Sequence, residues 1–134
     1  MEDNKIEINE LSEREILVGE NRIYLSEDKI IYFVNIGPID EKIALKSCEV
    51  MLKLRDMSRG KVHFFIDLNE GGKTTAKARS ILKEFTENNI HGKLAFWGMH
   101  PVAYLLSSFF MGITKKKDMR FFKTEEEALI WLKR

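Results

Sequence analysis

The order in which β-type and helical segments follow one another is the feature of this sequence that most constrains its fold. Residues 22–36 predict two strands joined by a polar turn at Ser26–Asp28. The segments that follow alternate between helical and β-type patterns, at residues 40–58, 61–68, 75–88, 93–98, 101–112, 119–122 and 124–134. The resulting order, β-β-α-β-α-β-α-β-α, predicts an α/β fold with a mixed sheet of about five strands, covered by about four helices.

Turn and capping residues indicate where these segments begin and end. Gly37 and Pro38 predict the end of the second strand, since both residues disfavour a strand interior. Asp40 is suited to cap the first helix, and Pro101 fits the first turn of the third. Thr124 is followed three residues later by a glutamate, which is the capping-box pattern of a helix start.

The size and composition of the chain predict one globular domain over residues 1–134. Of the 134 residues, 44% are hydrophobic and 32% are charged, which supplies both a core and a polar surface. Residues 1–13 are expected to be loosely ordered. Residues 15–19 are a candidate for an additional edge strand.

The charge of the chain is balanced overall but unevenly distributed. The formal net charge is +1, which argues against a nucleic-acid partner. Residues 1–28 hold nine acidic and three basic side chains, whereas residues 59–123 hold five acidic and twelve basic ones. Two interpretations remain open: both regions are ordinary solvated faces, or their opposite charges attract a partner or a second copy of the chain.

Cysteine content and hydropathy predict a cytoplasmic protein without stable membrane insertion. Cys48 is the only cysteine, so neither an internal disulfide nor a cysteine-based zinc site is expected, which fits a reducing compartment. Residues 1–16 are acidic and lack the apolar centre of a secretory signal. The longest apolar run, residues 101–113, is shorter than the ~20 residues that span a bilayer.

The sequence GGKTT at residues 71–75 raises the question of a phosphate-binding loop, because it joins a predicted strand to a predicted helix. A P-loop also requires a glycine where this chain has Asp67, so a nucleotide hydrolase is disfavoured. A weaker anion site at the helix N-terminus remains open. In the alternative interpretation, the glycines form a turn and a threonine caps the helix. The candidate phosphorylation or anion-binding residues are Asp67, Gly72, Lys73, Thr74 and Thr75.

Three stretches of the sequence resemble the STAS domains, in particular the SpoIIAA-like group named after the anti-sigma-factor antagonists. They are HFFIDL at 63–68, KLAFWG at 93–98 and RFFKTEEEALIWL at 120–132, and the resemblance extends over residues 20–134. It implies a compact sheet covered by helices, and a binding or regulatory role rather than catalysis. It also implies a phosphorylated hydroxyl at the start of the helix after the third strand, which corresponds to Thr74–Thr75 and would release a protein partner.

The sequence contains no constellation typical of catalysis or metal binding. His63, His91 and His100 are scattered, without carboxylates or cysteines at ligand spacing, so no metal site is predicted. Neither a Ser-His-Asp pattern nor a G-x-S-x-G elbow is present. Asp67, at the end of a strand, is either a general base or an anchor that accepts backbone hydrogen bonds from the following loop. No catalytic residue and no cofactor is therefore predicted.

The predicted helix at 101–112 is apolar on more than one face. Such a helix is normally buried on several sides, whereas an outer helix of a small domain keeps one polar face. The excess indicates a protein interface, a dimer seam or a lipid-facing surface, unless the helix is central in the core. Lys115–Lys117, just beyond it, would suit acidic lipid headgroups or the acidic N-terminal segment of a second copy. The candidate interface residues are Leu105, Leu106, Phe109, Phe110 and Met111.

Together these patterns predict a non-enzymatic domain that works by binding, with its site at residues 68–75 and 98–101. The leading hypothesis is a regulatory module that binds a protein partner or forms a homodimer. The alternative is a carrier or sensor of a small apolar or anionic ligand, lipid-like or nucleotide-like. A more distant resemblance to the CRAL-TRIO lipid-transfer proteins, a related branch of the fold, implies an apolar ligand. A hydrolase that uses Asp67 and Lys73 is the least favoured alternative.

Overall fold

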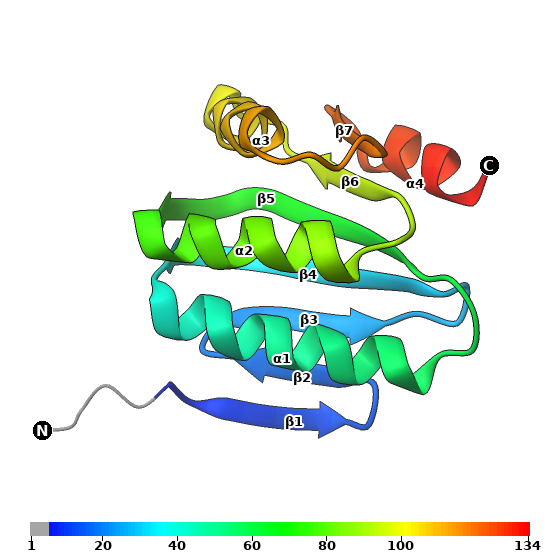
Figure 1. Cartoon of the computed structure of the whole chain (residues 1–134). Helices are drawn as coiled ribbons and strands as arrows, with labels where there is room; N and C mark the ends of the chain where they lie inside the picture. Colours follow the sequence, from blue (N-terminus) through cyan, green and yellow to red (C-terminus); the bar gives the residue numbers. More distant parts are fainter. Residues whose placement is uncertain (1–5) are drawn as a thin grey trace, which may run out of the picture.

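The computed structural model describes residues 6–134, which form a mixed β-sheet with helices packed on both faces (Figure 1). Within these residues the sheet has seven strands in the order β1-β2-β3-β4-β5-β6-β7. Their bounds are β1 (Ile8–Ser12), β2 (Glu15–Val18), β3 (Asn21–Leu25), β4 (Ile30–Ile39), β5 (His63–Thr74), β6 (Leu94–Trp97) and β7 (Met119–Phe122). The predicted mixed α/β sheet is confirmed, but the predicted number of strands was too low, because four strands rather than two precede the first helix.

The N-terminal edge of the sheet contains the strands that the predicted order lacks. β2 was predicted as an edge strand, but it is an inner strand, because β1 pairs with its other side. All five residues of β1 are exposed, so this strand has no buried face that an apolar alternation could indicate. Of the segment predicted to be loosely ordered, residues 1–5 lie outside the described part of the chain and residues 8–12 form β1.

β3 and β4 form the predicted hairpin. The two strands are antiparallel, with Ile23 opposite Phe33. The turn is closed by the N–H of Ser26, which donates to the carbonyl oxygen of Ile30 over 2.9 Å. Lys29 takes a left-handed conformation there, with φ of 62°. The hairpin places β4 in the middle of the sheet, where a parallel half can be added to its other side.

β4 continues through Gly37 and Pro38, so the predicted strand end at these residues was wrong. β3 pairs with β4 only as far as Val34, whereas β5 pairs with β4 up to Ile39. Beyond Val34 one edge of β4 therefore has no strand partner, and a proline without an N–H removes no ladder hydrogen bond there. Gly37, with φ of 75°, lies where the register between β4 and β5 shifts.

The half of the sheet from β4 to β7 is parallel because a helix connects each strand to the next. The helices within residues 6–134 are α1 (Glu41–Met57), α2 (Ala76–Asn89), α3 (Pro101–Ile113) and α4 (Glu125–Lys133). The carboxyl ends of the four parallel strands consequently lie at one edge of the sheet. Across the described residues, the helices are too short or too polar to pass through a bilayer.

The predicted capping residues are confirmed at three helix starts. The side chain of Asp40 accepts a hydrogen bond from the third residue of α1, and Thr75 does the same for α2. Thr124 accepts the backbone N–H of Glu127 over 3.2 Å, as the capping-box pattern predicts. Pro101 is the first residue of α3. Local side-chain hydrogen bonds thus set where the helices begin.

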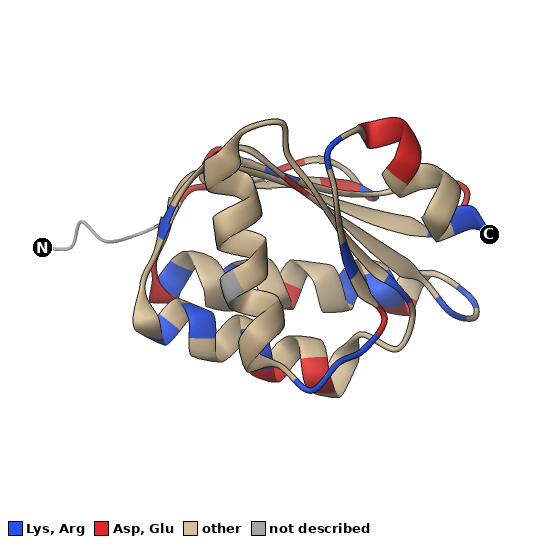
Figure 2. Cartoon of the chain, turned by 90° about the horizontal axis from the view of Figure 1, so that it is seen from above, with Lys and Arg blue, Asp and Glu red and all other residues tan. Residues whose placement is uncertain are grey.

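The helices cover the two faces of the sheet unequally. α1, α2 and α3 lie on one face and α4 on the other, as Figure 2 shows from above. The larger core lies under α1 and α2, while a smaller core under α4 contains Phe65, Ala95 and Leu132. α3 adds only half-buried apolar side chains to the larger core, such as Phe110 and Met111, while its buried Ala103 packs on Gly98. This looser packing is what leaves space for a cavity.

Candidate functional site

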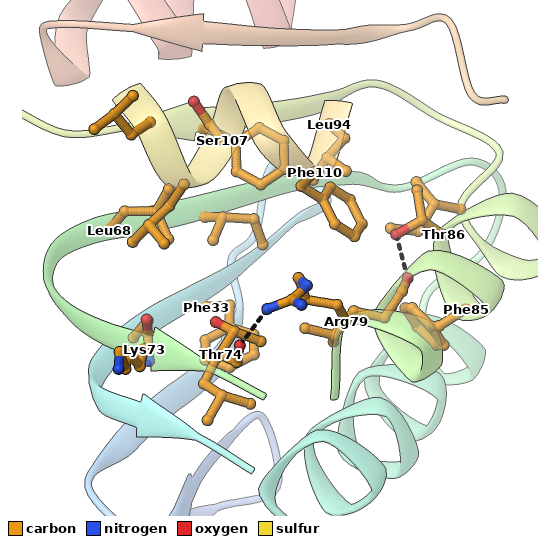
Figure 3. Close-up of a pocket in the computed structure, with 18 of the residues that line it drawn as sticks. Phe33, Leu68, Lys73, Thr74, Arg79, Phe85, Thr86, Leu94, Ser107 and Phe110 are labelled. Atoms are coloured by element: carbon orange, nitrogen blue, oxygen red, sulfur yellow. Dashed lines mark hydrogen bonds between the residues drawn. The ribbon is translucent and has the colours of Figure 1, made fainter. Parts of the chain in front are cut away.

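An apolar cavity lies between the sheet, α2 and α3 (Figure 3). Its volume is about 660 Å³, within the ~300–1,000 Å³ typical of small-molecule sites. Phe33, Leu68 and Phe96 line it from β4, β5 and β6, and Leu82 and Phe110 line it from the two helices. An enclosure of this composition excludes most polar ligands and favours an apolar molecule.

The cavity is present because α3 is held to the sheet near both of its ends. Near its start, Ala103 packs so closely on Gly98 that a Cβ on the glycine would lie 2.2 Å from that of Ala103. Near its end, the ring of Phe110 meets the ring of Phe96 edge-on, with centroids 5.8 Å apart. Leu106, between these contacts, lines the cavity. The space is therefore a consequence of how α3 crosses the sheet.

Basic side chains form the polar end of the cavity. Arg79 extends from α2 into it, and its Nη1 donates to the carbonyl oxygen of Thr74 over 2.6 Å (Figure 3). Lys73 lies at the edge of the cavity with an exposed side chain, and it forms no ion pair with a described residue. A guanidinium offers a planar fork of donors that matches a carboxylate or phosphate. The cavity thus combines an apolar body with a cationic end.

The GGKTT segment is not a phosphate-binding loop. Residues 71–74 are the end of β5, and this part of β5 pairs with β4 as far as Ile39 opposite Thr74. The predicted strand end at Leu68 and the predicted glycine turn were therefore wrong. The reason is that β4 itself continues past Pro38, which offers β5 a partner along its whole length.

Gly71 and Gly72 are required by the close approach of β4 and β5. A Cβ on Gly72 would lie 2.9 Å from the carbonyl carbon of Gly37, and a Cβ on Gly71 would lie 2.4 Å from Oδ1 of Asn35. Asn35 is buried and cannot easily move, because its Nδ2 donates to Oδ1 of Asn21 over 2.9 Å. The two glycines thus allow strand packing, a role that needs no ligand.

The two candidate threonines lie in different surroundings. Thr74 is half-buried and lines the cavity. Thr75 is exposed, and its Oγ1 accepts the backbone N–H of Ala78 over 3.1 Å, which makes it the helix cap. Of the two residues, Thr75 is the more exposed, at the start of α2.

Asp67 helps to connect β5 with the segment that follows β6. Its Oδ1 accepts the backbone N–H of Asn69 over 3.0 Å and the side-chain Nδ2 of Asn69 over 2.8 Å. Oδ1 of Asn69 then accepts the backbone N–H of Met99 over 2.7 Å. The segments after Asp67 and after Trp97, predicted to share one side of the sheet, are joined by these bonds. Lys73 lines the cavity and Asp67 does not, so the structure does not bring this pair together there.

The candidate interface residues of α3 separate into two groups. Leu105 is 65% exposed and points partly to solvent. Leu106, Phe110 and Met111 are half-buried and contact the cavity or the core, and Leu105 also lines the cavity. The side chain of Phe109 lies outside the described part of the structure. Of the described candidates, Leu105 is therefore the one most available to a partner.

The remaining titratable candidates are held in structural contacts. Nδ1 of His63 accepts the backbone N–H of Lys93 over 2.9 Å, and its pKa is lowered by burial and by neighbouring lysines. Burial raises the pKa of the Cys48 thiol to about 12, so it stays protonated at neutral pH. Within residues 6–134, no cluster of three or more His, Cys, Asp or Glu side chains could hold a metal ion.

Arg79 is the cavity residue that the sequence interpretation missed. It lies one position after Ala78 and three before Leu82, at the border of the apolar stripe of α2. A basic residue beside such a stripe is compatible with solvent exposure, because a long side chain can reach water from that position. The cavity that Arg79 lines exists only because α2, α3 and the sheet meet in the folded chain.

A mixed sheet with three helices on one face and one on the other, around a cavity at its parallel half, defines a STAS-like domain of the SpoIIAA type. An uncharacterized protein from the DUF3478 family with a SpoIIAA-like fold, from Shewanella loihica PV-4, matches with a TM-score of 0.62 and 17% identity over 98% of both chains. The anti-sigma factor antagonist SpoIIAA in its unphosphorylated form matches with a TM-score of 0.54 and 12% identity, over 84% of this chain and 97% of that one. The STAS-like fold predicted from the sequence is therefore confirmed.

The family of this protein is shown by the sequence itself. Residues 23–134 match the model of a family described as "Domain of unknown function (DUF7793)", and the chain belongs to this family. Among curated proteins, none matches the chain. The family description states no activity, so a function has to be argued from the site.

Proposed function

We propose that this protein binds a small amphipathic anion, with the apolar part of the ligand in the cavity and its acidic head beside Arg79. The observation that carries this proposal is a guanidinium that extends into a largely apolar cavity of about 660 Å³. Of the two functions predicted from the sequence, ligand carriage or sensing is thereby favoured over protein binding.

The chemistry of the cavity argues for both halves of such a ligand. Apolar ligand surface is stabilised by roughly 25 cal/mol per Å² removed from water, which favours an acyl or similar chain against Phe33, Leu82 and Phe96. A hydrogen bond to a charged group contributes about 1.5–3 kcal/mol, which favours a carboxylate or phosphate at Arg79. A nucleotide matches less well, because its sugar and phosphates would lie against apolar walls.

Binding of cis-parinaric acid, a fluorescent fatty acid, tests this proposal. Arg79→Gln is expected to weaken binding of the acid by at least about tenfold, because the charged hydrogen bond is lost. The uncharged methyl ester should bind the wild type and Arg79→Gln equally. Lys77→Gln is the matched control, since Lys77 is also basic and on α2 but does not line the cavity. Equal affinities of acid and ester for the wild-type protein would contradict the role of Arg79.

A second variant tests the apolar half of the site. Leu82→Trp places a larger side chain in the cavity and is expected to abolish binding of both the acid and the ester. Native mass spectrometry of the purified protein, with a denatured control, should in turn show a dissociable extra mass that Leu82→Trp loses. Undiminished binding by a folded Leu82→Trp protein would mean that the ligand binds elsewhere.

A regulatory protein-binding role is the second candidate, and the exposed position of Thr75 favours it. Thr75 lies at the start of the helix after a parallel strand, directly after the cavity residue Thr74. Thr75→Glu, a mimic of phosphorylation, is expected to change the set of proteins that the chain captures. Thr124→Glu is the matched control, because Thr124 also caps a helix. If both substitutions leave the captured proteins unchanged, this role fails.

A further inference from the structure

α3 presents an apolar surface to solvent. Val102, Tyr104 and Leu105 are 58%, 52% and 65% exposed, and Met99, just before the helix, is 71% exposed. Residues 101–113 include no charged side chain, and the described part of α3 accordingly carries neither blue nor red in Figure 2. Several exposed apolar side chains on one uncharged helix indicate an interaction site.

This surface is continuous with the wall of the cavity. Val102 and Leu105 line the cavity and are also more than half exposed. The same side chains therefore separate the cavity from solvent and form the exposed surface of α3. An apolar ligand that enters or leaves between them would meet whatever covers α3.

Basic side chains outnumber acidic ones beside the exposed surface of α3. Tyr104 shares a shallow depression with three basic residues and one acidic residue, Arg120, Lys123, Arg134 and Glu127, and with the exposed side chain of Ile130. Residues 99–123 together contain five basic side chains and one acidic one. The complementary surface is therefore both apolar and negatively charged.

We propose that α3 docks on the surface of an anionic lipid bilayer, where the cavity exchanges its ligand. The inference rests on the proposed function, since it names the place where that ligand is loaded or released. A basic rim beside exposed apolar side chains is the combination with which a helix lies in a membrane interface. A second copy of the chain fits less well, because a symmetric contact through α3 would bring two positively charged regions together.

Vesicle flotation measures this docking directly. The wild-type protein is expected to float with vesicles of equimolar phosphatidylcholine and phosphatidylglycerol, and less with phosphatidylcholine alone. Met99→Glu and Leu105→Glu should each reduce binding to the anionic vesicles by at least about tenfold, because each removes an apolar side chain from the interface and adds a repelled charge. Leu45→Glu is the control, since Leu45 is 52% exposed on α1 and should bind as the wild type does.

The two proposals can fail separately. Met99 does not line the cavity, so Met99→Glu should bind cis-parinaric acid normally in the absence of vesicles. Arg79→Gln should show the reverse, with weakened ligand binding and unchanged flotation. If Met99→Glu loses ligand binding, unfolding is the expected cause, and circular dichroism checks whether the variant is folded. Flotation of Leu105→Glu then provides the second test of docking.

Three outcomes would overturn the docking proposal. The first is a wild-type protein that does not float with anionic vesicles. The second is flotation that persists at full strength in folded Met99→Glu and Leu105→Glu proteins. The third is a wild-type protein that forms a dimer and does not bind vesicles, with a dimer that Leu105→Glu dissociates. The exposed surface of α3 would then contact a second copy of the chain.

Discussion

Two glycines at the end of β5 have a packing role that can be measured. Gly72→Ala is expected to lower the free energy of unfolding by about 1–3 kcal/mol, because the new Cβ would meet backbone atoms of Gly37. Gly112→Ala, on α3, is the control: nothing lies within 4 Å of its Cβ position, and alanine suits a helix. Urea unfolding measures both variants. If Gly72→Ala is as stable as the wild type, β4 and β5 can move apart to admit the new Cβ. This result would contradict the packing role of Gly72.

His63 predicts a pH dependence of stability. Its pKa in the folded protein is lowered from 6.5, first by burial and then by the charges of Lys93, Lys61 and Lys116, against the opposing charge of Asp118. Above pH 6.5 the side chain is neutral in both states and its stabilising contact with Lys93 is complete. As the pH falls below this value, the unfolded chain binds a proton before the folded one, so stability decreases.

Melting temperatures between about pH 8 and about pH 5 test this expectation. His63→Gln should remove the part of the acid destabilisation that belongs to His63. His91→Gln is the control, because His91 is exposed and lies outside this contact. If the melting temperatures of the wild type and of His63→Gln fall equally as the pH is lowered, the acid sensitivity arises from other groups.

Among the elements, β4 and β5 depart furthest from their predicted ends. Both were expected to stop at residues that disfavour strands, and both continue beyond them as one another's partners. The extended end of β4 and that of β5 stabilise each other. Without its partner, either end would lose the hydrogen bonds between backbone N–H and C=O groups of the two strands. The pairing also carries Lys73 and Thr74 to the edge of the cavity, so the length of these strands shapes the candidate site.

β1 and α4 should differ sharply in their contribution to stability. Removal of residues 1–12 deletes β1, whose side chains are all exposed, and costs edge hydrogen bonds, an exposed Lys53–Glu10 pair and the packing of the half-buried Ile6 on the larger core. Removal of residues 124–134 uncovers the core that contains Phe65 and Ala95. The first variant is expected to keep a cooperative thermal transition, and the second to lose it. Circular dichroism during heating tests both, and loss of the transition on removal of β1 would contradict this ranking.

In the whole molecule, the two ends of the sheet differ in net charge. α3, β7 and α4 lie at one end, where residues 99–134 hold seven basic and four acidic side chains, whereas the acidic N-terminal strands form the other end (Figure 1). Such a separation of charge orients the molecule in an external field. An anionic bilayer would attract the end with α3 and repel the end with β1. The overall net charge of +1 does not reveal this arrangement.

Local signals in the sequence were sufficient for much of the fold. Asp40, Thr75 and Thr124 each bond to a backbone N–H three residues away, so their capping roles depend on neighbours in the chain. The helices follow from the same short-range periodicity, and their alternation with strands predicted the parallel half of the sheet. β1 was not predicted, because all of its side chains are exposed and its sequence therefore has no alternation of apolar and polar residues to recognise.

Contacts between distant parts of the chain were required for the candidate site. The role of Gly71 and Gly72 depends on Asn35 and Gly37, which lie in another strand. The cavity depends on how α3 crosses the sheet, and the enclosure of Arg79 depends on the cavity. Capping and periodicity act within a few residues and can be recognised in the sequence, whereas a cavity is bounded by elements that approach only when the chain folds. The sequence therefore predicted the helices and most strands, and the packing of α3 determined where a ligand can bind.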